Sequence, residues 1–558
     1  TGLSIEAIPA QSSNTALVTT EVLAVFSERM DPLTIDTNSF VLLDSTAKKV
    51  VGNVDYFAQY GPDNNVAVFV PNNDLDVGEE YFATLTTDIT DTSGDPLARD
   101  YVWSFFIAPS PVAVSVDESD TFGTTGIDSV LPLPLPLPSP TFPWSNIESP
   151  SAPSATGEYV VFASTDNLAN LNTGGISQIY RKNTVTKKVE LVSATSNNQT
   201  VANGPCASPR ISDTGRYVVF TSLASNLDST VTNTAGKSHI YLKDMRDGTI
   251  RLLDRSITNV GEAGNGYSRN PDISGIPDTG SGKYVVFEST AVDLHADDTD
   301  DTSDIFLINV TSGTVELISI GYDPVNLVDV KGNDHSYRPR VSDNGRRIVF
   351  DSIATNLILA DGDSNGKSDI FLRNLGNDTT TRLSVDANGD EVSGGTVGST
   401  HADISADGVY TVFQSDKPTL VNDANNNITD IFVRETVDES TIEIFSLADG
   451  DADGANNDSE KPSISADGRY ITFESKASDL VASDTNGNVL DIFVRERNST
   501  TISLLSVNNN NDQGDLDSIN AAISSNGRYV SFTSAYNFDT SDGNGAADIY
   551  RAYNAEFR

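Results

Sequence analysis

ISADGRYITFES, residues 464–475, carries the pattern that decides the fold of this chain. An Ile-Ser pair, an Asp-Gly turn and an apolar run that closes on Phe473 follow one another directly. Successive copies are 58 to 67 residues apart and close on Phe162, Phe220, Phe287, Phe350, Phe413, Phe473 and Phe532. Seven copies at so regular a spacing predict a repeat architecture.

Each copy predicts about four antiparallel strands. Asp-Gly and Asn-Gly pairs tolerate the positive φ of tight hairpin turns, and they lie between β-rich runs such as RYITFES. Because sustained helical periodicity with caps is missing, we expect almost no helix. Four-stranded units bury their apolar faces only against neighbouring units, which favours a closed seven-bladed β-propeller.

The repeats resemble the TolB-like, WD-repeat-like propeller family. Each copy reads roughly S-x-D-G-x-x-[IV]-x-F-x-S, followed by an Ile-Tyr or Ile-Phe strand and a Leu-rich strand, over about residues 110–558. The resemblance implies the fold and leaves the function open.

A separate strand is expected to close the ring. The seventh copy ends in ADIYRAYNAEFR and has no outer strand, while PVAVSVDESD (111–120) is similar to TRLSVDANGD (381–390). We therefore expect Val112–Val116 to complete the last blade.

The proline-rich stretch VLPLPLPLPSPTFP (130–143) predicts a stiff surface insert that packs on the propeller or serves as a recognition segment.

Residues 1–108 lack the repeat and show short alternating strands with turn signals about every ten residues, which favours a β-sandwich. The pieces FSERMDP (26–32), FVPNNDLDVGEEYFATL (69–85), DTSGDPL (91–97) and YVWSFF (101–106) resemble the bacterial Ig-like domain of S-layer and other surface proteins. That resemblance implies an exported bacterial protein. We thus expect an all-β chain with an Ig-like sandwich over 1–108 and a propeller over 109–558.

The composition excludes several function classes. With 79 Asp and Glu against 35 Lys and Arg, the formal charge of -44 disfavours nucleic acid and anionic membranes and suits cations. A single cysteine, Cys206, excludes an internal disulfide, and four histidines argue against a multi-histidine metal centre. No long apolar run or signal-peptide pattern occurs, so we expect a processed, soluble product without membrane insertion.

Five acidic loops precede the third strands of their repeats, as in DGDSNGKSDIF (361–371). Carboxylate and amide oxygens at alternate positions of a tight loop suit calcium, which takes six to eight oxygen ligands. The expected calcium ligands are Asp298, Asp300 and Asp304; Asp361, Asp363, Asn365 and Asp369; Asp423, Asn425, Asn427 and Asp430; Asp484, Asn486, Asn488 and Asp491; and Asp542, Asn544 and Asp548.

Two further loops end in Gln178 and His239 and are expected to be nearly metal-free. The alternative for all loops is that the final aspartate only hydrogen-bonds turn amides. Catalysis by these carboxylates is not expected, because a general acid needs a raised pKa in a desolvated cleft.

Basic residues recur just before or within the first strand of five repeats and are expected to surround the channel mouth. They are Arg210, Arg269, His335, Arg338, Arg340, His401 and Lys461. Such a ring suits a carboxylate-bearing ligand such as an acidic glycan or a peptide terminus, and the alternative is salt bridges to neighbouring acids. His335 and His401 also permit a metal-dependent polyuronate lyase, although a third ligand is missing.

These features favour a non-enzymatic, calcium-stabilised bacterial protein that is secreted or on the cell surface. We expect a surface-structural, assembly or adhesion role, with copies of itself or other surface proteins as partners. The alternative is an acidic-glycan-binding or polyuronate-lyase-type propeller that acts at the channel mouth.

Overall fold

The computed structural model describes 21 ranges of the chain. They are residues 5–8, 13–16, 22–58, 65–73, 75, 80–107, 112–116, 151–169, 171, 173–196, 200–233, 236–275, 283–323, 328–358, 363–421, 428–436, 441–447, 454–481, 484–508, 513–538 and 546–554. The proline-rich stretch 130–143 lies outside them.

The chain divides into two compact units, Thr1–Val112 with Val507–Asp512, and Ala113–Ser506 with Gln513–Arg558. Within the described ranges the only helix is the short 3-10 helix η1 (Pro32–Thr34), so the expectation of an all-β chain is confirmed. None of the described helical structure is long and apolar enough to cross a membrane.

The first unit contains two four-stranded sheets, with strand orders β1-β3-β6-β5 and β2-β8-β7-β4. In β3 the burial alternates along VLAVF, as expected for a strand with one face in a core. Phe40 packs against Phe69 and Trp103, each with ring centroids 5.8 Å apart. The strands are β1 (Ile5–Ile8), β2 (Ser13–Ala16), β3 (Val22–Phe26), β4 (Phe40–Leu43), β5 (Gly52–Ala58), β6 (Asn65–Pro71), β7 (Glu80–Leu85) and β8 (Tyr101–Ile107).

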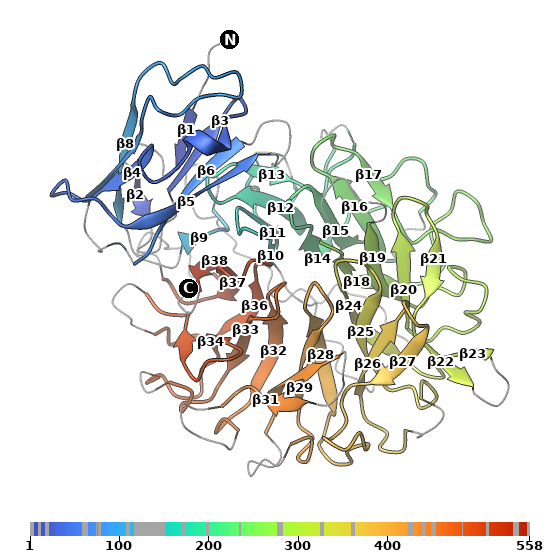
Figure 1. Ribbon diagram of the computed structural model, residues 1–558. Coiled ribbons are helices and arrows are strands. Elements are labelled where there is room, and N and C mark those ends of the chain that lie inside the picture. Colours follow the sequence, from blue (N-terminus) through green and yellow to red (C-terminus); the bar gives the residue numbers. More distant parts are fainter. Residues whose placement is uncertain are drawn as a thin grey trace. The chain divides into compact units, whose positions relative to one another are not determined.

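The second unit contains seven four-stranded sheets within the described residues, which we number blades 1 to 7. Figure 1 shows them following one another around a common axis, with the first strand of each blade innermost. The strands of blades 1 to 7, in that order, are β10 (Ser151–Pro153), β11 (Tyr159–Ser164), β12 (Gln178–Asn183), β13 (Val189–Leu191); β14 (Cys206–Ile211), β15 (Tyr217–Ser222), β16 (His239–Asp244), β17 (Ile250–Leu252); β18 (Ser268–Ile273), β19 (Tyr284–Ser289), β20 (Asp304–Asn309), β21 (Val315–Leu317); β24 (Ser336–Val341), β25 (Arg347–Ser352), β26 (Asp369–Asn374), β27 (Thr379–Arg382); β28 (Ser399–Ile404), β29 (Tyr410–Ser415), β30 (Asp430–Glu435), β31 (Ile442–Ile444); β32 (Ser459–Ile464), β33 (Tyr470–Ser475), β34 (Asp491–Glu496), β35 (Ile502–Leu504); and β36 (Ser518–Ile523), β37 (Tyr529–Ser534), β38 (Asp548–Tyr553), β9 (Val112–Ala113).

The repeated phenylalanine explains why each copy forms a blade. In blade 6, Phe473 on β33 pairs with Phe493 on β34, and their rings stack at 5.8 Å. An equivalent stacked aromatic pair joins the second and third strands in each of the six remaining blades. Aromatic cross-strand pairs stabilise a sheet beyond the area they bury, and here they fix its register.

The ring closes as the sequence predicts. The strand β9 is the outermost strand of blade 7, beside β38. The Val114 N–H donates to the Ile549 carbonyl at 2.7 Å. A chain segment that precedes blade 1 therefore completes the last blade.

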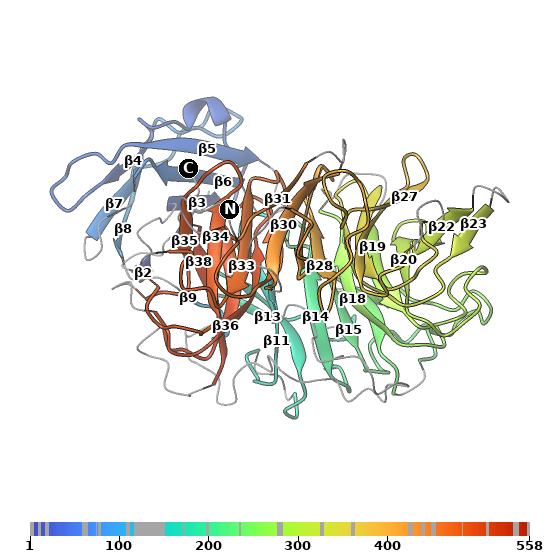
Figure 2. The ribbon, with the colours of Figure 1, turned by 90° about the horizontal axis from the view of Figure 1, so that it is seen from below.

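Two features of the propeller were not predicted. The hairpin β22 (Ile320–Asp323) and β23 (Val328–Lys331) forms a separate two-stranded sheet after blade 3, visible at one side of Figure 2. The first strands of blades 2 to 7 each contain a register shift. Non-glycine residues with positive φ lie at these shifts, namely Ser208, Asn270, Arg338, His401, Lys461 and Asn520.

Candidate functional site

Each acidic loop ends at the first residue of the third strand of its blade, and this residue is fully buried. In blades 3 to 7 it is an aspartate, whereas blades 1 and 2 have Gln178 and His239. The buried aspartates are Asp304, Asp369, Asp430, Asp491 and Asp548. Burying a carboxylate is costly unless it is hydrogen-bonded or paired with a cation.

A serine two residues after the fourth strand holds one oxygen of each of these aspartates. In blade 3 the Ser319 hydroxyl donates to Asp304 Oδ1 at 2.6 Å and accepts the Ile305 N–H. The corresponding serines in blades 4 to 7 are Ser384, Ser446, Ser506 and Ser115. The final aspartate thus accepts a serine hydroxyl on one carboxylate oxygen, and the second carboxylate oxygen of the aspartate can take other partners.

Blades 1 and 2 use the same position differently. Ser193 donates to Gln178 Oε1 at 2.6 Å. In blade 2, Asp254 takes the place of the serine and lies 2.7 Å from His239 Nδ1. Neither blade therefore has an aspartate at the end of this loop.

The blade 4 loop contains a compact group of carboxylates. One oxygen from each of Asp363, Asp369 and Glu391 lies within 4.8 Å of the others. Both oxygens of Asp363 are buried without a hydrogen-bond partner. Burial and the neighbouring Asp369 raise the pKa of Asp363 to about 6. These oxygens offer the hard ligands that calcium prefers.

Cations and hydrogen-bond donors surround the blade 4 carboxylates. The fully buried Lys417 ammonium pairs with Asp369 Oδ1, and Arg382 lies 3.6 Å from Glu391 Oε1. The Asn365 side-chain amide donates to Asp369 Oδ2 at 3.1 Å. Glu391 comes from the loop that leads to blade 5, and its Oε1 accepts the Ser364 and Asn365 N–H groups at 3.1 Å each. Burial acts to raise the pKa of Glu391, but these hydrogen bonds lower it below its usual value. Asp361 lies outside the described residues.

The blade 3 loop also gathers its three predicted aspartates, and it holds a lysine among them. The Lys331 Nζ lies 2.8 Å from Asp304 Oδ2, 3.0 Å from Asp300 Oδ1 and 3.9 Å from Asp298 Oδ1. The Asp298 side chain is fully buried, and neither of its oxygens has a hydrogen-bond partner. Burial, with Asp304 nearby, raises the pKa of Asp298 to about 7.

In blade 6 the predicted residues form a partly neutral group. The Asn486 side-chain amide donates to Asp491 Oδ2 at 2.7 Å, and the Gln513 amide donates to Asp484 Oδ1 at 3.2 Å. Burial raises the pKa of Asp491 to about 6. Asn488 instead accepts a hydrogen bond from Asn457.

The loops of blades 5 and 7 are placed only at their final aspartates, Asp430 and Asp548. The other predicted ligands there, namely Asp423, Asn425, Asn427, Asp542 and Asn544, lie outside the described residues.

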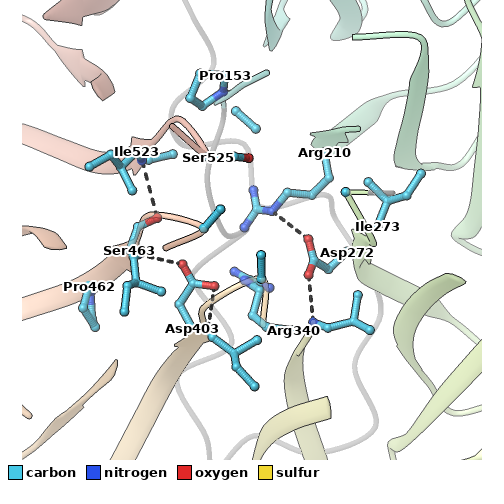
Figure 3. Close-up of a pocket in the computed structure, with 18 of the residues that line it drawn as sticks. Pro153, Arg210, Asp272, Ile273, Arg340, Asp403, Pro462, Ser463, Ile523 and Ser525 are labelled. Atoms are coloured by element: carbon cyan, nitrogen blue, oxygen red, sulfur yellow. Dashed lines mark hydrogen bonds and ion pairs between the residues drawn. The ribbon is translucent and has the colours of Figure 1, made fainter. Parts of the chain in front are cut away.

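The predicted basic ring divides into two groups. Arg210, Arg340, His401 and Lys461 line a cavity on the propeller axis (Figure 3). Arg269, His335 and Arg338 are not among its lining residues. The His335 ring accepts the Ser303 N–H at 2.8 Å and stacks on Tyr337, so His335 and His401 do not meet in this cavity.

Ion pairs hold several of these basic groups, as the salt-bridge alternative predicts. Arg269 lies 2.7 Å from Glu288, Arg338 lies 2.6 Å from Asp351, and Lys461 lies 2.9 Å from Glu474.

Aspartates share the cavity wall with the arginines, which the sequence did not reveal. They are Asp213, Asp272, Asp343 and Asp403. Asp272 lies 3.8 Å from Arg210 Nε and accepts the Val341 N–H, and Asp403 accepts the Ile464 N–H (Figure 3). Burial raises the pKa of Asp272 although two arginines are near. The wall therefore carries both signs of charge.

Residues 3–106 match the family model of the bacterial Ig-like domain. A comparison with curated proteins found no significant match. Among solved structures, the chain is similar to TolB from Acinetobacter baumannii, with 16% identity over 57% of this chain and 60% of that one and a TM-score of 0.32. An oligogalacturonate lyase in complex with manganese gives 10% identity, 73% and 90% coverage and a TM-score of 0.43. The propeller domain of the Trilobed protease from Pyrococcus furiosus gives 11% identity over 62% of this chain and 82% of that one, with a TM-score of 0.35.

The match assigns the sandwich of the first unit to the bacterial Ig-like domain, as its sequence pieces suggest. The chain spans 60% of the length of the TolB structure.

Several charged residues beside the acidic loops escaped the sequence analysis, among them Lys331 and Glu391. Both come from the loops between blades, 22 or more residues along the chain from the final aspartate they approach. Inter-blade loops of this kind carry no local motif, and only the packing of the blades brings them to the acidic loops.

Proposed function

We propose that this chain is a non-enzymatic, extracellular bacterial protein whose propeller is stabilised by calcium and which has a surface-structural, assembly or adhesion role. The observation that carries the proposal is the blade 4 loop, where Asp363, Asp369 and Glu391 converge and both oxygens of the half-buried Asp363 are shielded from solvent without a hydrogen bond. Lys417 and Arg382 offset part of the negative charge of this group. A divalent ion would offset the rest and would join the start of β26 to the loop before blade 5.

The extracellular setting is supported by the Ig-like domain and by the charge. The match at residues 3–106 is to a bacterial domain family. Loop sites on extracellular modules bind calcium with affinities in the range of about 0.1 to 1 mM, which millimolar external calcium fills. Copies of the chain or other surface proteins are the partners that a structural role requires.

The alternative role at the channel, binding or cleavage of an acidic polysaccharide, has less support. Arg210 and Arg340 point into the cavity in Figure 3, but four aspartates line the same wall. An acidic ligand would have to overcome their repulsion.

Thermal unfolding of the whole chain with millimolar calcium and with EDTA tests the proposal. We expect a higher Tm in calcium, because an ion that binds only the folded state stabilises it by mass action. Asp363→Asn should reduce that difference, whereas Asp329→Asn, a matched change at an exposed aspartate of β23, should leave it unchanged. Equal Tm values of the wild type in calcium and EDTA would refute calcium stabilisation.

A further inference from the structure

In blades 1 to 5, the residue three positions after the end of the fourth strand forms a β-bridge with a residue of the loop that leads to the next blade. This partner occupies the same structural position in all five loops. The pairs are Ala194 with Val201, Arg255 with Ala263, Ile320 with Lys331, Val385 with Glu391, and Leu447 with Gly454. We call the second residue of each pair the bridge position.

The bridge position faces the acidic loop of the blade that precedes it. In blade 4, Glu391 joins the carboxylates of Asp363 and Asp369. In blade 5, a Cβ on Gly454 would lie 2.7 Å from Asp430 Oδ2, so the missing side chain leaves that oxygen room. Blades 1 and 2, whose loops end in Gln178 and His239, have the apolar Val201 and Ala263 there.

In blade 3 the bridge position is Lys331, and its ammonium group has an oxygen shell like that of a bound cation. Besides the three aspartates, the Lys331 Nζ donates to Thr302 Oγ1 at 2.9 Å and to the Gly332 carbonyl at 3.2 Å. The oxygens of the buried Asp298 accept no hydrogen bond. Among the described residues, Lys331 is the cation that forms an ion pair with Asp298.

We propose that Lys331 is a tethered cation that fills the blade 3 loop in place of a metal ion, and that the bridge position helps to select the occupant of the acidic loops of blades 3 and 4. An ammonium group supplies a compact positive charge and three donors, which suits a shell of oxygens. Glutamate at the same position adds an anionic ligand in blade 4, where Lys417 already pairs with Oδ1 of Asp369, and makes that loop a site for a divalent ion. The blade 4 part rests on the proposed function, and the blade 3 part does not.

Reciprocal charge changes at the bridge position test this assignment. Calcium bound per chain is measured by equilibrium dialysis, and Tm is measured in EDTA and in calcium. Lys331→Glu should bind one calcium ion more than the wild type, with a lower Tm in EDTA that calcium restores. Glu391→Lys should bind one ion fewer and should show a smaller difference in Tm between calcium and EDTA. Lys48→Glu, at an exposed lysine of the Ig-like domain, is the matched control and should change neither quantity.

A variant that keeps Lys331 covers the case in which Lys331→Glu does not fold. Asp298→Asn should leave the number of bound calcium ions at the wild-type value, and the loss of an ion would overturn the proposal. So would a folded Lys331→Glu protein that binds no additional calcium. If the wild type binds no calcium but Lys331→Glu binds one ion, the function proposed for blade 4 fails and the role of Lys331 stands.

Discussion

At the scale of single residues, Asp213 should make stability depend on pH. It lies in the turn between β14 and β15, lines the axial cavity and accepts a hydrogen bond from the Ser525 hydroxyl. Burial raises its pKa to about 6 from 3.8. A folded pKa above the unfolded value gives a stabilisation that is complete below pH 3.8 and is lost as the pH rises through about 6. The change in the free energy of unfolding caused by Asp213→Asn should therefore be more favourable at pH 8 than at pH 4, by about 2 kcal/mol.

Thermal melts of both proteins between pH 4 and pH 8, in EDTA, measure this difference, and the other titrating groups cancel in the comparison. Asp329→Asn, at an exposed aspartate, serves as the control for the removal of one carboxylate from the surface. An Asp213→Asn effect that does not vary with pH would contradict the assignment.

The sequence predicts residues that act within one loop and misses those that act between blades. Asp298, Asp300 and Asp304 lie within seven residues, so their spacing alone suggests a common centre, and the structure brings them together. Their partner Lys331 enters from a hairpin beyond β21, and no local pattern marks it. The aspartates in the cavity wall were missed for the same reason, since each comes from a different blade.

At the scale of elements, the Asp-Gly turn has a second role that its sequence does not show. Gly468 has a φ of 69°, and a Cβ there would lie 2.5 Å from Cδ2 of Tyr410 in the preceding blade. Gly468→Ala should therefore destabilise the protein twice, by backbone strain of about 1 kcal/mol and by displacing the tyrosine. Gly313→Ala isolates the first effect, because Gly313 has a φ of 76° and open space around its Cβ position. Urea unfolding measures both, and equal losses would show that the contact with Tyr410 is unimportant.

Strand positions follow from the sequence better than strand irregularities do. The repeat predicts the hairpin turns and the paired phenylalanines, because both depend on local propensity and period. The bulges of the inner strands, as at Lys461 with a φ of 48°, depend on the partner strand and on the neighbouring blade. The Lys461 N–H donates to Gln414 of blade 5 at 2.8 Å, a contact that only the assembled ring provides.

At the scale of the whole molecule, the ring depends on a strand that is distant in sequence from the rest of its blade. Besides the hydrogen bond from Val114 to Ile549, the Ser115 hydroxyl donates to Asp548 and accepts the Ile549 N–H. The Lys182 ammonium of blade 1 then donates to the Val116 carbonyl at 3.1 Å. This short segment thus contacts both the last and the first blade.

Proline at Val114 should open the ring, whereas proline at the equivalent position of blade 1 should not. The Val192 N–H donates to the Ile179 carbonyl at 2.8 Å, as the Val114 N–H does to that of Ile549. Val114→Pro and Val192→Pro each remove one hydrogen bond, worth on the order of 1 kcal/mol. In blade 1 the fourth strand stays attached through the chain that follows β12, but in blade 7 β9 comes from a distant part of the chain and is held beside β38 by noncovalent contacts. For Val114→Pro we expect the rate of backbone amide hydrogen exchange in β38 and β12 to rise sharply. For Val192→Pro we expect the amides of blade 7 to exchange at the wild-type rate. Equal protection of β38 in the two variants would show that β9 is not what closes the ring.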